Sequence, residues 1–178
     1  MSLPQSRLAA VKNHITASSN ASSKPSRKSV NTYRERSDYK YFAPVQTRWA
    51  DNDQYGHVNN AIYYVYMDAV INAYLIEYCK LSPTDVTQPL GLVVTSHADF
   101  YSAASYPSML QAGLVVTRIG KSSITYRVGI FDDEQAQACV VGGFTHVVVD
   151  PMHRRPVQAI PEDILNGVQA ILSPENVQ

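Results

Sequence analysis

The stretch from Asn60 to Lys80 constrains the fold most, because it is long, apolar and free of helix breakers. It contains neither glycine nor proline, and Asp68 is the only charged residue between Asn60 and Ile76. A helix that is apolar nearly all round is buried on most of its sides. Asn60, Asp68 and Asn72 make this helix too polar for lipid, so we expect protein to wrap it.

Segments with strand character lie on both sides of this helix. Tyr41–Ala50 is predicted to be extended, and four later segments are rich in valine, isoleucine, threonine and aromatic residues, with turn signals between them. These four are Leu92–Tyr101, Met109–Arg118, Ile124–Phe131 and Ala138–Val149. Pro161 opens a short terminal helix that runs to about Leu172. The sequence therefore predicts an α+β fold in which one curved antiparallel sheet surrounds one long central helix.

Composition limits the classes of function. A chain of 178 residues with 45% apolar residues fits one domain with a real core. The net charge of +0 argues against a nucleic-acid binder that neutralises phosphates. No apolar run approaches the roughly 20 residues that cross a bilayer, so we expect a soluble protein. Cys79 and Cys139 show no CxxC spacing and are predicted to be buried free thiols.

Residues 1–40 differ in composition from the rest of the chain. The part from Met1 to Arg34 is basic and serine-rich and has no acidic residue. Organelle transit peptides share these properties, but so does a disordered basic tail without an address. We therefore expect a tail before a folded domain of residues 41–178, and a mitochondrial or cytoplasmic location.

The segment Arg48–Tyr63 carries the predicted chemistry. Its sequence RWADNDQYGHVNNAIY places two carboxylates just before the buried helix, with Asn59 or Asn60 as a natural N-cap. Free amides at a helix N-terminus are donors for developing negative charge. A carboxylate beside them can act as a general base or a nucleophile while the amides stabilise a tetrahedral oxyanion. This pairing predicts acyl transfer.

The same segment resembles the hotdog-fold acyl-CoA thioesterases of the 4-hydroxybenzoyl-CoA thioesterase type. Members carry a pattern like R-[WYF]-x-D-x-D-x-x-G-H-V-N-N-x-x-Y, which this chain matches through Tyr63. A weaker resemblance runs from about Tyr41 to Pro161. The resemblance implies a hotdog fold, hydrolysis of an acyl-CoA to a free acid and CoA, and no metal or redox cofactor. It also implies a homodimer or a tetramer of dimers, with active sites between subunits.

The resemblance assigns catalytic roles within this motif. The second aspartate of D-x-D is the catalytic carboxylate of the family, and it falls on Asp53. A backbone amide a few residues later donates to the oxyanion, and it falls near Asn60, whose side chain is expected to cap the helix. His57 either orients Asp53 or the substrate, or is a structural group.

The resemblance assigns substrate binding to two other regions. Lys121 and Ser122 lie in a turn that resembles the loop meeting the CoA nucleotide, and Arg154 and Arg155 match a common arginine-rich ending. The chain departs from many members at Tyr106-Pro107-Ser108, where they have Tyr-Gly-Asp. It also lacks a basic partner beside Asp68. These departures leave the acyl group unassigned.

Other interpretations of the acidic and histidine residues stay open. Asp53 could cap local amides as a turn residue. We expect Asp51 to be structural, paired with Arg48. Asp68 is the alternative catalytic acid, or else a hydrogen-bonded polar group of the core. His97 could line the pocket, although an ordinary sheet position fits it better.

The same segment bears on metal binding and on other activities. Asp51-x-Asp53-x-x-Gly56 matches the start of a calcium loop, but Tyr55 and Ile62 occupy positions that need oxygen ligands. We therefore expect no metal site. The alternatives to an acyl-CoA thioesterase are a dehydratase or acyl-carrier-protein thioesterase on the same fold, or a catalytically silent acyl-thioester binding protein.

Overall fold

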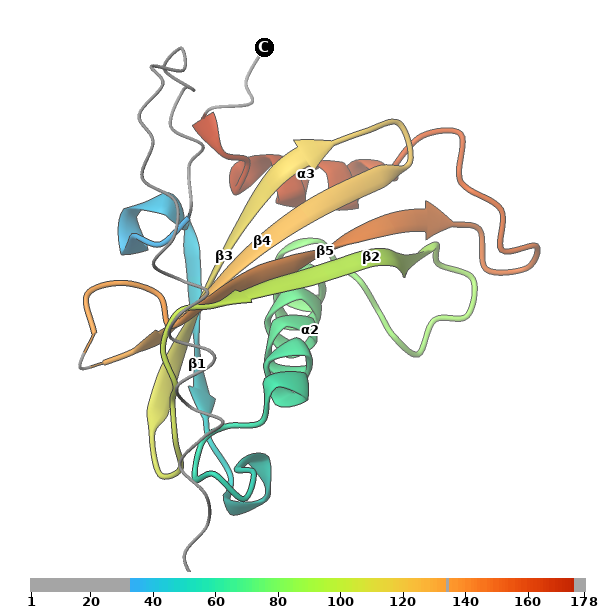
Figure 1. Ribbon diagram of the computed structural model, residues 1–178. Coiled ribbons are helices and arrows are strands. Elements are labelled where there is room, and N and C mark those ends of the chain that lie inside the picture. Colours follow the sequence, from blue (N-terminus) through green and yellow to red (C-terminus); the bar gives the residue numbers. More distant parts are fainter. Residues whose placement is uncertain (1–32, 134, 175–178) are drawn as a thin grey trace, which may run out of the picture. The chain divides into compact units, whose positions relative to one another are not determined.

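The computed structural model describes residues 33–133 and 135–174 of the chain. The elements follow the order η1 (Arg36–Asp38), β1 (Tyr41–Gln46), η2 (Trp49–Asp51), α2 (Asn60–Tyr78), β2 (Leu90–Phe100), β3 (Met109–Ile119), β4 (Ser123–Asp132), β5 (Val140–Val149) and α3 (Glu162–Ala170). The strands form one five-stranded antiparallel sheet in the order β1-β3-β4-β5-β2. The sheet curves around α2, which connects its two edge strands (Figure 1). The predicted α+β hotdog fold is confirmed.

The first strand is shorter than the predicted segment Tyr41–Ala50. It ends at Gln46, and Trp49–Asp51 forms a single 3-10 turn. The backbone amide of Arg48 donates to the Asp51 carboxylate at 2.7 Å, which closes this turn in place of a further strand hydrogen bond. The carboxylate thus redirects the chain from the sheet toward α2.

One face of α2 forms the centre of the main core. Its buried side chains recur at the three- and four-residue spacing of one helix face. They are Tyr63, Tyr66, Met67, Val70, Ile71, Tyr74 and Leu75. Inward-facing strand residues such as Leu114, Val128 and Ile130 belong to the same core. The long helix and the sheet therefore stabilise each other.

The opposite face of α2 is open to solvent in the single chain. Val65 is 52% exposed and Ile76 is 47% exposed on this face. The neighbouring edge strand β2 is also exposed, with Val93 at 50% and Val94 at 55%. The prediction that protein wraps α2 on most sides is therefore wrong for one chain, because an apolar pattern does not reveal which chain supplies the cover. No helix in the described part of the chain is long and apolar enough to cross a membrane.

A second, smaller core lies on the sheet face away from α2. It contains Tyr33, Tyr39, Val115, Phe131, Ala138 and Val141. The Tyr39 ring lies over Gly113 and Gly129, which pair across β3 and β4. The Tyr39 hydroxyl donates to the Tyr33 carbonyl at 2.6 Å. Packed residues therefore reach back to Tyr33, and the rest of the predicted tail, residues 1–32, lies outside the described residues.

We predict that Gly129→Ala destabilises the fold through Tyr39. A Cβ at residue 129 would lie 2.5 Å from the Tyr39 hydroxyl oxygen and from its Cζ. Overpacking of this kind lowers the free energy of unfolding by about 1–3 kcal/mol, which urea denaturation measures. In a Tyr39→Ala background the same change should be much less damaging. Equal losses of stability in both backgrounds would contradict the packing of the Tyr39 ring against Gly129.

Candidate active site

Asp51 fixes the approach to the candidate site. Its buried carboxylate accepts from Arg48 Nη2 at 2.7 Å and Nε at 3.0 Å, and from the Tyr66 hydroxyl at 2.6 Å. The Asp51 carbonyl accepts from the Asn59 amide at 2.8 Å, directly before α2. Burial raises the pKa of the Asp51 carboxyl, but the hydrogen bonds from Arg48 and Tyr66 outweigh it and hold that pKa below its ordinary value. The predicted structural pairing of Asp51 with Arg48 is confirmed.

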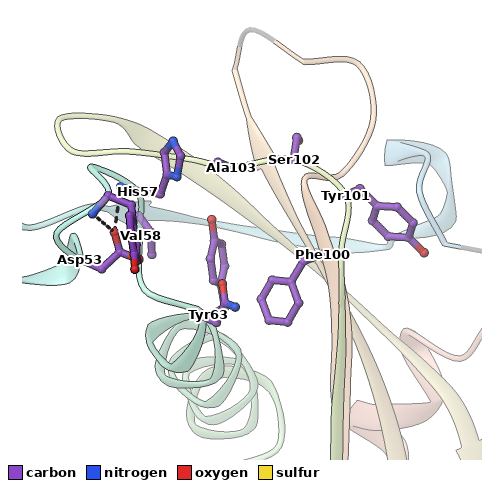
Figure 2. A pocket seen from close by; sticks show the side chains of 10 residues that line it. Asp53, His57, Val58, Tyr63, Phe100, Tyr101, Ser102 and Ala103 are labelled. Atoms are coloured by element: carbon purple, nitrogen blue, oxygen red, sulfur yellow. Dashed lines mark hydrogen bonds between the residues drawn. The ribbon is translucent and has the colours of Figure 1, made fainter. Parts of the chain in front are cut away.

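Asp53 lies in the turn that follows. Its Oδ1 accepts from the backbone amides of Tyr55 at 2.8 Å and His57 at 3.4 Å (Figure 2). Gly56 allows this turn because its φ of +82° lies in the left-handed region that glycine adopts easily. Asp53 therefore caps local amides, as the structural interpretation expects, but only with Oδ1. No hydrogen bond among the described residues uses Oδ2.

The start of α2 leaves one backbone donor free. Asn59 is the N-cap, and its Oδ1 accepts from the Ala61 amide at 2.9 Å. The Ile62 amide donates to the Asn59 carbonyl at 2.9 Å. The expected cap at the Asn60 side chain is therefore wrong, because Asn59 takes this position and Asn60 is the first helical residue. Within residues 33–133 and 135–174, no hydrogen bond uses the Asn60 amide, which is a normal orphan of a helix N-terminus.

A cavity of about 540 Å³ brings Asp53, His57 and Asn60 together. Its other wall comes from Tyr63 on α2 and from the end of β2, and Figure 2 shows Tyr63 between the Asp53 turn and Phe100. The lining residues are Asp53, Tyr55, His57, Val58, Asn60, Tyr63, Phe100, Tyr101, Ser102 and Ala103. The three predicted catalytic residues thus share one cavity that has both polar and apolar walls.

A second hollow of about 450 Å³ also has Asp53 in its wall. Trp49 and Tyr106 line it and make an edge-on ring contact with centroids 5.9 Å apart. Asp53 therefore stands between two hollows, and only the larger one contains Asn60.

The predicted CoA-binding residues lie at the far end of the sheet. The Asp53 turn is held to the start of β3, because the Tyr106 amide donates to Asn52 Oδ1 at 3.1 Å. Lys121 follows the other end of this 11-residue strand, about 35 Å away at ordinary strand rise. One chain therefore does not bring Lys121 to Asp53.

The remaining CoA-binding candidates gather near Lys121. The Ser122 carbonyl accepts from the Val148 amide at 2.7 Å, near the end of β5. Arg154 and Arg155 are exposed in the loop after β5, and Lys121 Nζ donates to Gln158 Oε1 at 3.3 Å. The structure therefore places the two predicted regions together, but away from the cavity that holds Asp53.

Asp68 and His97 line neither hollow. Asp68 is exposed on the open face of α2, where its Oδ1 accepts from Asn72 Nδ2 at 3.1 Å. The interpretation of Asp68 as a polar group of the core is wrong for one chain, because the open face of α2 carries it. His97 contacts Arg127, consistent with an ordinary sheet position.

Sequence reasoning missed the wall that faces Asp53. In the sequence, Tyr63 marks only the end of the motif, and Phe100 and Tyr101 mark only the end of the predicted strand Leu92–Tyr101. Ser102 and Ala103 carry no signal. Apolar and aromatic residues at a strand end carry no signal that separates a pocket from a core. In the described ranges, no three histidine, cysteine, aspartate or glutamate side chains gather as a metal site.

We predict that Asp51→Asn destabilises the protein by about 2–4 kcal/mol, because a buried charged acceptor is lost. The folded-state pKa of Asp51 is depressed, so its contribution is present above the unfolded pKa of about 3.9 and is lost as pH falls through the folded value. Urea denaturation between pH 7 and pH 2 measures this loss. Asp53→Asn is the matched control and should unfold nearly as the wild type does, since asparagine caps as well as aspartate.

The comparisons with known proteins agree with this fold. The thioesterase superfamily matches residues 55–139. The solved structure of the PA5185 protein from Pseudomonas aeruginosa is 41% identical, with a TM-score of 0.76 over 79% of this chain and 98% of that one. No curated protein matches the chain in sequence.

More distant solved structures share the fold. A 1,4-dihydroxy-2-naphthoyl-CoA thioesterase from Synechocystis is 19% identical, covering 72% of this chain and 95% of that one, with a TM-score of 0.66. A DHNA-CoA thioesterase from Staphylococcus aureus is 16% identical, covering 72% and 90%, with a TM-score of 0.63.

Fold and cavity together define a hotdog protein with a carboxylate beside a helix N-terminus. The chain belongs to the thioesterase superfamily, as the motif predicted. Its general chemistry is hydrolysis of acyl thioesters.

Proposed function

We propose that the protein hydrolyses acyl-CoA thioesters to a free acid and CoA, with Asp53 as the catalytic carboxylate. The observation that carries this proposal is the shared cavity, which is lined by Asp53 and by Asn60, the residue whose amide is free. The carboxylate either takes a proton from attacking water or attacks the thioester carbonyl itself. The Asn60 amide donates to the oxyanion that forms. No metal or redox cofactor takes part in this proposal.

The turn prepares Asp53 for this role. The amides of Tyr55 and His57 fix Oδ1, so the position of Oδ2 is also restricted. A carboxylate held in this way loses little freedom when the substrate binds. His57 orients Asp53 through its backbone amide, while its side chain lines the cavity. The proposed substrate class has support from relatives whose names specify CoA thioesters.

We further propose a homodimer, alone or paired into a tetramer, in which the β2 strands of two copies join. Strand β2 is a long exposed edge beside the open apolar face of α2, and such an edge favours pairing with another chain. A two-fold axis makes the two edge strands antiparallel, so the Leu90 end of one copy lies beside the Phe100 end of the other. Arg154 shares a hollow with Leu90. The partner subunit would therefore bring its cations toward Asp53.

We predict that Asp53→Asn lowers kcat by at least about 100-fold while the protein stays folded, because asparagine is neither a base nor a comparable nucleophile. The measurement is release of free thiol from a panel of acyl-CoAs, with thermal unfolding as the check on folding. Asp68→Asn is the matched control, and we expect it to lose much less activity.

Three outcomes would change this assignment. Nearly wild-type turnover of folded Asp53→Asn would leave Asp53 as a cap only. A dead Asp68→Asn in that case would move the acid to α2. A wild-type protein that binds acyl-CoA without releasing thiol would be a silent binding protein or a dehydratase.

We also predict that Lys121→Ala, Arg154→Ala and Arg155→Ala together raise KM for acyl-CoA and leave kcat largely unchanged, because phosphate contacts are shared by ground and transition states. Mixing this triple variant with Asp53→Asn tests whether the site is shared between subunits. Random exchange of subunits should restore about a quarter of the wild-type rate at low substrate concentration. Absence of any recovery after demonstrated exchange would place the cations and Asp53 in independent sites.

A further inference from the structure

The buried tyrosine hydroxyls of α2 differ in what they do with their protons. The Tyr66 hydroxyl donates to Asp51 Oδ2 at 2.6 Å, and the Tyr74 hydroxyl donates to the Gly167 carbonyl at 2.8 Å. The Tyr63 hydroxyl instead accepts from the Ala104 amide at 3.2 Å. Among the residues that the structure describes, none accepts the Tyr63 proton. This hydroxyl is therefore fixed as an acceptor and has an unused donor.

The Tyr63 ring is held firmly in the cavity wall. Its relative exposure is 2%, and it makes edge-on contacts with Phe100 at 5.7 Å and with Tyr66 at 6.1 Å between ring centroids. Tyr63 nevertheless lines the 540 Å³ cavity together with Asp53 and Asn60 (Figure 2). A buried hydroxyl that keeps a free proton at a cavity wall suits a ligand acceptor.

The helix geometry directs Tyr63 toward the free amide. Tyr63 follows Asn60 by three residues, so both lie on the same face of the first turn of α2. Side chains on a helix lean toward its N-terminus and cover the preceding turn. The phenol therefore reaches toward the end of the helix from which the Asn60 amide points.

We propose that Tyr63 is a catalytic residue whose hydroxyl donates a second hydrogen bond to the thioester carbonyl oxygen, beside the Asn60 amide. This inference rests on the proposed acyl-CoA hydrolysis. No proton leaves Tyr63 in this role. The carbonyl oxygen gains negative charge as water or Asp53 attacks, two donors hold that charge, and the oxygen returns to a carbonyl as the thiolate departs.

Two properties of Tyr63 suit a donor of this kind. Burial raises the pKa of Tyr63 to about 12, so the phenol keeps its proton near neutral pH. The Ala104 amide donates to the phenol oxygen, and a hydrogen bond accepted by an O–H group strengthens the one that it donates. The same amide also fixes the position of the hydroxyl before substrate arrives.

The first test is turnover of Tyr63→Phe with acyl-CoA. Loss of one oxyanion donor lowers kcat by about 100-fold or more, and the accompanying rise in KM should be much smaller. Tyr74→Phe is the matched control, since it removes a buried hydroxyl from the same helix away from the cavity. It should lose stability but keep kcat. Wild-type kcat in Tyr63→Phe, or equal losses in both variants, would overturn the proposal.

Binding of two unreactive analogues separates recognition of the carbonyl from packing. A 2-oxoalkyl-CoA keeps the carbonyl, and an S-alkyl-CoA of the same length lacks it. Tyr63→Phe should lower the affinity for the 2-oxoalkyl-CoA by roughly fivefold to tenfold, which corresponds to the loss of one neutral hydrogen bond. The affinity for the S-alkyl-CoA should stay unchanged. Equal weakening of both analogues would show that the hydroxyl only supports the fold.

A second variant, which keeps the shape of the Tyr63 side chain, tests the proposal even if Tyr63→Phe does not fold. Difluorotyrosine at residue 63 retains both hydrogen bonds and lowers the phenol pKa, so kcat should fall at a lower alkaline pH than in the wild type. The same replacement at Tyr74 should leave the pH profile unchanged. An unshifted alkaline limb for the residue 63 variant would refute the donor role.

The two proposals fail in different ways. A wild-type protein that hydrolyses no thioester removes the proposed function and the Tyr63 role with it. Active wild type, inactive Asp53→Asn and fully active Tyr63→Phe would remove the Tyr63 role alone.

Discussion

The buried carboxylate of Asp51 is the interaction on which the rest of the site depends. It joins Arg48, which lies just after β1, to Tyr66 in the second turn of α2. The backbone carbonyl of Asp51 accepts from the Asn59 amide, directly before α2. Asp51 and Asn59, which lie on either side of the turn that carries Asp53, are therefore both held in place. A buried charged acceptor with several donors is costly to disrupt. Asp51, which does not line the cavity, therefore sets the position of the Asp53 carboxylate.

The helix and its N-terminus were predictable from the sequence, because their signals are local. The unbroken apolar run of α2 and the capping residues before it need no knowledge of the rest of the fold. The choice of Asn59 over Asn60 as the cap was not predictable, since both residues suit it. The sequence indicated only the side of the cavity that carries Asp53. The contact between Phe100 and Tyr63 was not predictable, because these residues are far apart in the sequence and periodicity reports only local structure.

The open face of α2 shows a different limit of sequence reasoning. The nearly uniform apolar pattern predicted cover on most sides of α2, but one chain covers only the side that faces the sheet. Val65 on α2 and Val93 on β2 stay exposed, and Lys121 stays remote from Asp53. The proposed homodimer along β2 would account for all three facts.

Each of the two cores buries one face of the inner strands. Residues of β3 and β5 are buried against α2 on one face and against the Tyr33–Tyr39 segment on the other. Substitutions there disturb one core or the other. Strand β2 and the loops at its ends are exposed. They border the cavity that contains Asp53 at one end of the strand and the hollow that contains Arg154 at the other. Substitutions in this margin can therefore change the shape of the hollows with less effect on the two cores than substitutions inside the sheet.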